Sequence, residues 1–292
     1  MKNHGESARI LGAGFFFADP DHEIGIVNLL LVLLALRKHP NKQAVFLDVG
    51  MNTGFFSNLM AAQGAEVHAF ETQPRCFKYA SSALSASGLS SQSVFLYNAG
   101  LTDSPGSILQ STQGCDGSNN ALSKKSVSLK HIQSWGGGSK RVPTFVLDDS
   151  MPASCAPHIF AVKMDTEGAE VMILRGMRKL LKRIDNLQVE LGPMYWKNYG
   201  VTPADGVALL KQLTNSFGYD AYLMWHVRHD REGRPLSGTG PDLAAGAHPA
   251  GAQCTGSSAT LRPVLDWQAL VTCCMEQNSG ANIWFTRQFA RK

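Results

Sequence analysis

Two acidic residues at the ends of apolar runs have the spacing needed to bind one ligand together. Asp48 lies in the apolar run 45–49, which Gly50 and Gly54 follow before a helix-like pattern begins. This spacing predicts a buried strand that turns sharply into a helix, with a ligand at the turn. Glu71 follows a second apolar run, and a carboxylate there can accept hydrogen bonds from both hydroxyls of a ribose. The two segments together predict a nucleoside-containing cofactor at the carboxyl ends of a parallel sheet.

Asn52 narrows the choice of cofactor. A dinucleotide fingerprint needs a glycine at this position, because the backbone must approach the pyrophosphate closely. The Walker pattern with Gly-Lys-Ser/Thr is also absent from the sequence. A ligand with a ribose but no polyphosphate remains, and S-adenosyl-L-methionine meets that description. Its amino-acid end is expected over the turn, near Asp48 and the amides around Gly50.

Three further carboxylates lie close together after another apolar run. Asp165 is expected at the tip of a strand, Glu167 in the following turn and Glu170 at the start of a helix. We expect a chemical role for Asp165, whereas Glu167 could equally well cap backbone amides. For Glu170, a favourable interaction with the helix dipole is the better explanation.

A strand–helix rhythm predicts the fold that positions these carboxylates. It favours a doubly wound α/β domain, Rossmann-like, with a seven-stranded and mostly parallel sheet whose last two strands are antiparallel. The ligand crevice is expected outside strands one and four, where the winding direction reverses. The predicted strands are 44–49, 66–70, 94–98, 158–164, 187–191, 219–225 and 282–286, with helices at 54–63, 74–87, 169–182, from Pro203 to Gly218, and at 265–275.

The chain is expected to have two parts, a helical lead-in at 1–43 and the α/β domain at 44–292. The apolar run 26–36 is shorter than the ~20 residues that span a bilayer. We therefore expect a buried helix there, with membrane contact as the less favoured alternative. The Gly/Pro/Ala/Ser-rich stretch 228–261 is predicted to be a mobile surface insertion.

Two segments in the middle of the chain interrupt the rhythm. Residues 102–139 are rich in Ser, Gly and Asn, and we expect them to form a hairpin and a loop over the cofactor mouth. The run 141–147 is predicted to be an edge strand, because Pro143 cannot donate to a central ladder.

Charge and cysteine content limit the partners and the compartment. The formal net charge of +4 on 292 residues is too small to predict nucleic-acid binding. The six cysteines form no Cys-x-x-Cys pair and no set with zinc spacing. We therefore expect reduced thiols, in the cytoplasm or another reducing compartment.

Several motifs in this order resemble those of the FkbM family of S-adenosylmethionine-dependent methyltransferases. The resemblance covers about residues 45–191, and Met51 and Thr72 stand where the family usually has alanine and proline. The matching segments are Phe-Leu-Asp-Val-Gly-Met-Asn-Thr-Gly-Phe-Phe at 46–56, Ala-Phe-Glu at 69–71, Asn-Ala-Gly-Leu-Thr-Asp at 98–103, Leu-Asp-Asp at 147–149 and Lys-Met-Asp-Thr-Glu-Gly-Ala-Glu at 163–170.

The resemblance implies a class I methyltransferase and a role for each matching residue. Glu71 would hold the ribose, and Asp165 and Glu167 would face the transferred methyl group. The cofactor-binding residues implied in this way are Asp48, Gly50, Asn52, Gly54, Phe55, Glu71, Thr72, Asn98, Ala99 and Asp165. The implied reaction is O-methylation of a hydroxyl on a sugar or another small-molecule or glycan acceptor.

Such an acceptor has to lose a proton, so a positioned base accelerates the transfer by about 10²–10⁴-fold. Asp165 is the first candidate, Glu167 the second and Glu190, at the end of predicted strand five, the third. A variant of this hypothesis gives Asp165 and Glu190 to a divalent cation that lowers the pKa of the acceptor. The sequence does not require a metal, and we predict none.

Two other functions fit the predicted fold. A non-catalytic module could keep the fold and the ligand, but the intact set of acids argues against it. An oxidoreductase that uses a nicotinamide dinucleotide would need a glycine in place of Asn52.

Overall fold

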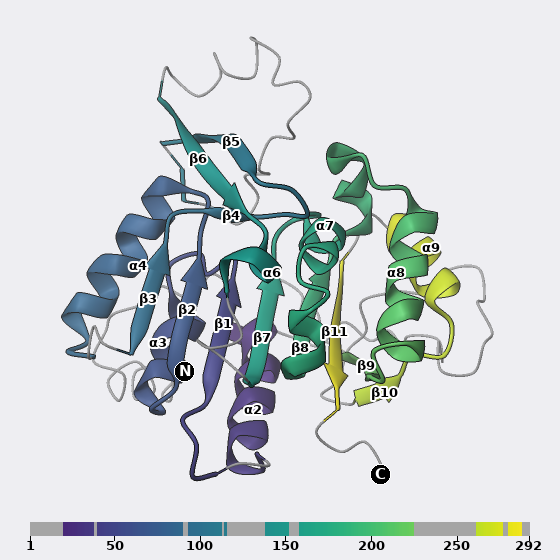
Figure 1. Cartoon of the computed structure of the whole chain (residues 1–292), viewed down its shortest axis with the longest axis horizontal. Coiled ribbons are helices and arrows are strands. Elements are labelled where there is room, and N and C mark those ends of the chain that lie inside the picture. Colours follow the sequence, from purple (N-terminus) through teal and green to yellow (C-terminus); the bar gives the residue numbers. More distant parts are fainter. Residues whose placement is uncertain are drawn as a thin grey trace, which may run out of the picture.

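A mostly parallel sheet forms the centre of the protein. The structure is a computed structural model that describes residues 20–37, 40–89, 93–112, 114–115, 138–151, 158–224, 261–276 and 280–287. The main sheet has eight strands in the order β10-β9-β11-β8-β7-β1-β2-β3 (Figure 1). These strands are β1 (Val45–Val49), β2 (Glu66–Phe70), β3 (Val94–Tyr97), β7 (Ile159–Asp165), β8 (Ile184–Leu191), β9 (Asp220–Met224), β10 (Leu261–Pro263) and β11 (Ala281–Thr286).

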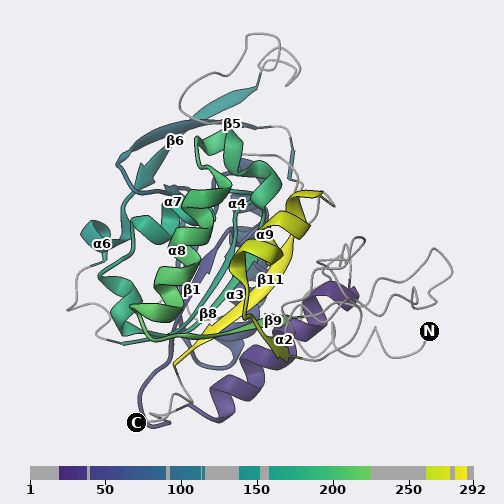
Figure 2. The same ribbon diagram turned by 90° about the vertical axis from the view of Figure 1, so that its right-hand side faces the viewer.

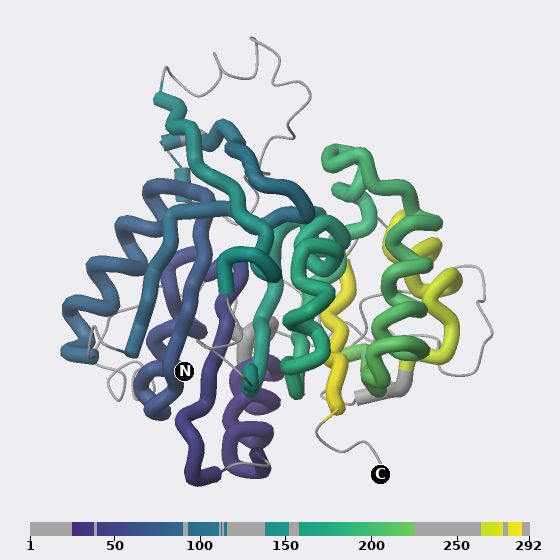
Figure 3. The backbone as a smooth tube through the Cα atoms, viewed as in Figure 1, coloured from purple at the N-terminus to yellow at the C-terminus, as the bar shows by residue number. Residues whose placement is uncertain are grey.

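The sheet grows in two directions from β1, which pairs in parallel with β2 on one side and with β7 on the other. In Figure 3 the blue strands β2 and β3 therefore lie on one side of β1, and the teal strands β7 and β8 of the main sheet lie on the other. The predicted crevice position, between strands one and four, is this point between β1 and β7. Parallel strands end at the same edge, so their carboxyl ends lie close together there.

The strand directions refine the prediction for the last strands. β11 is antiparallel to both β8 and β9. The last two predicted strands are thus antiparallel to each other, but β9 runs in the direction of the parallel strands. The short strand β10 pairs antiparallel with β9 and was not predicted, because it adjoins the stretch assigned to the insertion.

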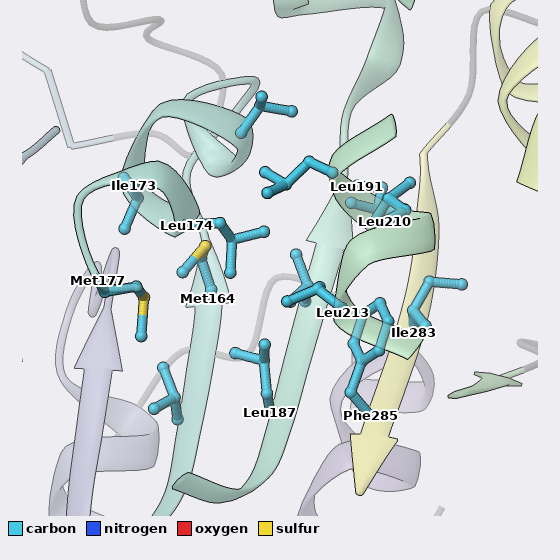
Figure 4. Close-up of a cluster of buried hydrophobic side chains, with 14 of the residues drawn as sticks. Met164, Ile173, Leu174, Met177, Leu187, Leu191, Leu210, Leu213, Ile283 and Phe285 are labelled. Atoms are coloured by element: carbon cyan, nitrogen blue, oxygen red, sulfur yellow. The ribbon is translucent and has the colours of Figure 1, made fainter. Parts of the chain in front are cut away.

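Helices cover both faces of the sheet (Figure 2). One core lies between the sheet and α7, α8 and α9, and its side chains from β7, β8 and β11 point toward these helices (Figure 4). A second core lies between the opposite face and α2 and α3. The helices are α2 (Pro20–Ala35), α3 (Phe55–Ala62), α4 (Pro74–Ala86), α6 (Leu147–Ser150), α7 (Glu170–Arg175), α8 (Pro203–Asn215) and α9 (Trp267–Glu276), with 3-10 helices η1 (Leu180–Arg183) and η2 (Pro193–Tyr199).

The predicted helix 169–182 is divided into α7 and η1. Gly176 ends α7 because its backbone lies against the backbone of Thr102, where an added Cβ would be 2.2 Å from the carbonyl oxygen. The carboxylate of Asp148 then accepts hydrogen bonds from the backbone N–H groups of Lys179 and Leu180. These contacts to distant residues interrupt a segment whose apolar periodicity is continuous.

A second, three-stranded sheet corrects the prediction for 141–147. It has the order β4-β6-β5, so β6 (Ser139–Phe145) is its central strand and not an edge strand. β5 (Gly106–Ser111) pairs with β6 from Ser139 to Thr144, whereas β4 (Gly100–Leu101) pairs only with Thr144 and Phe145, beyond Pro143. The short partner strand thereby leaves Pro143 outside the β4 ladder.

The apolar N-terminal run forms α2, which packs on the second core. Ile26, Leu30 and Leu33 are each at most 2% exposed and contact this core. None of the helices in the described ranges has both the length and the apolar character needed to cross a membrane.

Two cysteines in the described region are joined, which corrects the prediction of reduced thiols. Cys76 in α4 forms a disulfide with Cys115, beyond the end of β5. Cys273 is also disulfide-bonded, whereas Cys274 is free and buried. The spacing along the sequence gave no sign of this pairing, because the two joined cysteines are 39 positions apart. The expectation of a reducing compartment therefore loses the observation on which it was based.

Candidate active site

The turn between β1 and α3 has the backbone that its glycines predict. Gly50, Asn52 and Gly54 all have positive φ angles, of 79°, 52° and 85°. At Gly50 an added Cβ would lie 1.8 Å from the carbonyl oxygen of Asp165, so the tips of β1 and β7 touch through their backbones. Only glycine permits this approach, and it fixes the distance between the turn and Asp165.

Glu71, immediately after β2, is held by two backbone amides. Its carboxylate accepts hydrogen bonds from the N–H groups of Asn52, at 2.9 Å, and Gln73, at 2.7 Å. The side chain is buried, and burial raises its pKa to about 7 although these two hydrogen bonds act in the opposite direction. The carboxylate is thus oriented before any ligand binds.

The second sheet is tied to the residues around Glu71. The side-chain amide of Asn98 donates to the backbone oxygens of Glu71, at 2.8 Å, and Thr72, at 3.3 Å. Lys140 of β6 donates to Asn98, and Gln110 of β5 donates to the hydroxyl of Thr72. The strands of this sheet therefore hold the loops that follow β2 and β3.

A cavity of about 340 Å³ lies at the carboxyl ends of β1, β2 and β7. On the side of β1 and β2, its wall includes Asn52, Glu71 and Thr72, and the second sheet contributes Ile108 and Thr144. On the side of β7, the wall is made by Asp165, Thr166, Glu167, Met172, Ile173 and Tyr199. The cavity has the size of a small-molecule site and joins the two predicted motifs.

Lys163 organises the acids at the tips of β7 and β8. Its ammonium donates to the backbone oxygen of Gly50, at 3.3 Å, and to the carboxylate of Asp165, at 3.2 Å. Asp165 pairs in register with Glu190 on the neighbouring strand. Burial disfavours the charge on Lys163, but attraction to Asp165, Asp48 and Glu190 outweighs it and raises the lysine pKa above its usual range.

Glu167 lies in a loop whose backbone is strained. Its φ of 52° is left-handed, a conformation that costs a non-glycine residue about 1–3 kcal/mol. Burial, followed by repulsion from Asp165 and Glu190, raises the pKa of Glu167 to about 8. Glu167 is therefore a neutral acid at pH 7, which makes it a hydrogen-bond donor and a poor base.

Glu170 holds this loop in place through hydrogen bonds. Its fully buried carboxylate accepts hydrogen bonds from the N–H of Gly168 at 2.7 Å, the indole of Trp196 at 3.0 Å and the hydroxyl of Thr166 at 3.1 Å. This arrangement agrees with the structural explanation expected from its position at the start of a helix.

The structure brings most of the predicted site residues to the cavity. Of the predicted site residues, those in the cavity lining are Gly50, Asn52, Glu71, Thr72, Ala99, Asp165 and Glu167. The lining does not include Asp48, Gly54, Phe55, Asn98 or Glu190, and Asp48 is buried with a 2.6 Å hydrogen bond from the hydroxyl of Ser57. Within the ranges that the structure describes, no three His, Cys, Asp or Glu side chains are arranged to hold a metal ion.

Sequence reasoning gave no role to Lys163, whereas it singled out the aromatic stretch 194–199 that contains Tyr199. Lys163 had a signal, because it is a charged residue inside the otherwise apolar strand β7. Tyr199 belongs to an aromatic stretch that could equally form an acceptor wall or a lid packed on the core. Its place in the lining favours the first of these.

The Methyltransferase FkbM domain matches residues 48–217, which is more than half of the chain. The chain belongs to the FkbM methyltransferase family. The matched region contains the first motif from Asp48 onward, all of the motif at 163–170 and every cavity-lining residue named above. No curated protein matches it in sequence.

Solved structures similar to this FkbM methyltransferase include three methyltransferases. An rRNA methylase from Streptococcus thermophilus has 11% identity and a TM-score of 0.39, covering 93% of this chain and 98% of that chain. The N-terminal domain of human METTL16 in complex with SAH has 13% identity and a TM-score of 0.41, with coverages of 73% and 72%. The bifunctional kinase-methyltransferase WbdD has 10% identity and a TM-score of 0.43, and the match covers 93% of this chain but only 42% of WbdD. The family assignment rests on the domain match.

Proposed function

We propose that the protein transfers a methyl group from S-adenosyl-L-methionine to a hydroxyl of a sugar or another small-molecule or glycan acceptor. The observation that supports this most is the convergence of Glu71 and Asp165 on one cavity. Glu71 reaches it from β2 and Asp165 from β7, with the turn after β1 between them. A nucleoside at Glu71 would extend along this turn toward Asp165.

The residues on the β1 and β2 side fit the cofactor. Glu71 accepts hydrogen bonds from the ribose hydroxyls, and the apolar side chains of Leu101 and Ile108 offer a surface for the adenine. Gly50 and Asn52 border the methionine end, with Asp48 buried behind the turn. S-adenosyl-L-methionine held by these residues would supply an electrophilic methyl group, with its sulfur as the leaving group.

The residues on the β7 side position and deprotonate the acceptor. Asp165 accepts the proton of the acceptor hydroxyl as the new C–O bond forms. Lys163, at 3.2 Å, orients the Asp165 carboxylate, and Glu190 lies beside it on β8. Alignment of this kind can supply several kcal/mol of the barrier reduction. Glu167 keeps its proton at neutral pH, so it donates a hydrogen bond instead of acting as the base.

Asp165→Asn tests this assignment. Fractions of cell extract are first screened for transfer of an isotopically labelled methyl group, which identifies an acceptor. We expect the variant to transfer methyl about 10²–10⁴-fold more slowly, because it lacks the base. The matched control is Asp185→Asn, at the opposite end of the parallel strands, where Asp185 bonds His158. Full turnover by Asp165→Asn contradicts the role of Asp165. Binding of NAD but not of S-adenosylhomocysteine by the wild type contradicts the proposed cofactor.

A further inference from the structure

A second groove lies between α8 and the segment that follows α7. These two helices lie side by side in both ribbon views (Figures 1 and 2). The groove has a volume of about 410 Å³, which is within the range of small-molecule sites. Among the described residues, none lines both this groove and the cavity of the candidate active site. The groove is therefore a separate feature of the surface.

Opposite charges cancel at one end of the groove. The guanidinium of Arg175 forms a 3.2 Å ion pair with the carboxylate of Asp205. Hydrogen bonds from Thr202, together with Arg175, hold the pKa of this carboxyl below its usual range. Asp205 is therefore ionised and balances the charge of Arg175. Among the described residues that line the groove, it is the only acid.

Two cations remain further along the groove. The guanidinium of Arg178 donates a hydrogen bond to the side-chain oxygen of Gln212 in α8, the residue next to Lys211. Arg178 and Lys211 both line the groove and both are exposed to solvent. A guanidinium has five N–H donors, so the bond to Gln212 leaves Arg178 with donors for a ligand. This part of the groove thus carries two positive charges that no acid of the lining balances.

The ends of the helices do not account for these two cations. Cations are favoured in the last turn of a helix, and Arg175 holds that position in α7. Arg178 comes after α7 has ended and before η1 begins at Leu180. The last turn of α8 contains no basic residue, so Lys211 lies outside it. The two cations are brought together by the packing of two segments that are distant in sequence.

We propose that this groove binds the phosphate group of a soluble small molecule between Arg178 and Lys211. A phosphate monoester carries a charge of about −1.5 to −2 at pH 7, which matches the two unbalanced cations. The planar guanidinium can donate two parallel hydrogen bonds to phosphate oxygens, and the ammonium supplies a compact positive charge. Ala208 and Leu209 give the lining an apolar part that can contact the organic portion of the ligand. This site goes beyond the proposed methyl transfer and does not depend on it.

The double variant Arg178→Gln/Lys211→Gln tests the proposal, because it removes both charges and keeps polar side chains. The matched control is Lys42→Gln/Lys78→Gln, which removes two exposed charges elsewhere, before β1 and in α4. The net charge falls equally in both variants, so a general electrostatic effect would be the same. Isothermal titration calorimetry with inorganic pyrophosphate, at low and at physiological ionic strength, measures binding to the three proteins.

We expect the wild type to bind pyrophosphate saturably, with an affinity that falls as salt is added. Arg178→Gln/Lys211→Gln should bind it at least about tenfold more weakly, because hydrogen bonds between ionised partners are about twice as strong as neutral ones. Lys42→Gln/Lys78→Gln should bind it within about twofold of the wild type. Equal melting temperatures of the three proteins would show that the loss is not caused by unfolding.

The phosphate group could be carried by a methyl acceptor or by a separate ligand, and a second measurement distinguishes these sources. Pyrophosphate is added to the labelled-methyl assay with the acceptor found in the extract screen. A KM that rises for the wild type but not for Arg178→Gln/Lys211→Gln assigns the phosphate to the acceptor. An unchanged KM, with pyrophosphate binding retained in calorimetry, assigns it to a separate ligand.

Three results would overturn the proposal. The first is a wild type that does not bind pyrophosphate at low ionic strength. The second is an equal affinity of the wild type and Arg178→Gln/Lys211→Gln, or an equal loss in the control variant. The third is sedimentation of the wild type with vesicles of phosphatidylcholine and phosphatidic acid, without binding of pyrophosphate, which would make this face a lipid-binding surface instead.

Discussion

The backbone N–H of Asn52 donates a 2.9 Å hydrogen bond to the carboxylate of Glu71, nineteen positions further along the chain. This bond joins the turn after β1 to the end of β2, which are the two segments that the cofactor is proposed to contact. With the N–H of Gln73 as a second donor, the carboxylate has a single orientation. A ligand that bonds Glu71 therefore meets a group that needs no reorganisation.

Glu71→Gln should weaken the binding of S-adenosylhomocysteine by about 10–100-fold, because hydrogen bonds to a charged acceptor contribute about 1.5–3 kcal/mol. The amide nitrogen of the glutamine would also face the N–H donors that now hold the carboxylate. Isothermal titration calorimetry measures the change. Glu66→Gln is the control, since Glu66 lies on the same strand but pairs with His68. Equal affinities of Glu71→Gln and the wild type would remove Glu71 from the cofactor site.

Substitutions at Gly50 and Gly64 distinguish the cost of backbone strain from the cost of a steric overlap. Gly50 and Gly64 have nearly the same φ, 79° and 80°, but a Cβ at Gly64 would meet nothing within 4 Å. Gly64→Ala should therefore cost about 1 kcal/mol in the free energy of unfolding, the usual cost of a left-handed alanine. Gly50→Ala should cost at least about 3 kcal/mol more, because its methyl group would overlap the carbonyl oxygen of Asp165. Urea denaturation measures both values, and similar losses would show that β1 and β7 are not in contact at this point.

The stability of the protein should depend on pH through its buried acids. The usual pKa of a glutamate is 4.5, and burial raises the pKa of Glu167 to about 8. The unfolded chain thus releases this proton near pH 4.5, whereas the folded protein keeps it until about pH 8. The folded state binds more protons in this window, so stability falls as the pH rises through it.

Glu167→Gln should remove that contribution. Glu71 and Glu170 both have a pKa of about 7, so their contribution to the fall in stability ends near pH 7. Between pH 7 and 8 the melting temperature of the wild type should continue to fall, while that of Glu167→Gln should level off. Differential scanning calorimetry from pH 5 to 9 makes the comparison, and parallel curves would contradict the raised pKa of Glu167.

The disulfide between Cys76 and Cys115 should stabilise the protein. It closes a long loop in the unfolded chain, and a bridge of this sequence separation contributes about 2–4 kcal/mol. The Sγ of Cys115 also lies 3.4 Å from the side-chain oxygen of Asn52, so the bridge fixes the chain beyond β5 against the cofactor turn. The double variant Cys76→Ala/Cys115→Ala should unfold at lower denaturant concentration and bind S-adenosylhomocysteine more weakly.

Cys274, which is free and buried in the described part of the chain, provides the control for this prediction. Cys274→Ala keeps the Cys76–Cys115 bridge, so its affinity for S-adenosylhomocysteine should still decrease when a phosphine reductant is added. The double variant should show no such loss of affinity, although the reductant still breaks the bridge of Cys273. A wild type whose affinity and stability are the same with and without reductant would contradict the role of the bridge.

Local patterns predicted the elements around the site well. The bounds of β2 are those expected, and the turn after β1 has positive φ at both predicted glycines. The long-range contacts were not predictable in this way. Lys163 bonds Gly50 across 113 positions, and no periodicity in the sequence indicates which residue a buried lysine will meet. Pro143 likewise predicted an edge strand, because the sequence does not show that β4 is too short to reach it. The lining position of Tyr199 depends on how η2 packs on Gly168, which is a tertiary contact.

The contact between Gly50 and the carbonyl of Asp165 sets a fixed distance between the proposed cofactor side and the proposed acceptor side of the cavity, so a change of acceptor has to leave this contact in place. Under the proposed function, new acceptors would be accommodated by replacing η2, whose Tyr195 packs on Gly168 and whose Tyr199 lines the cavity. Transplanting residues 193–200 from a relative is thus the simplest way to redirect this enzyme, with the geometry of transfer left as it is.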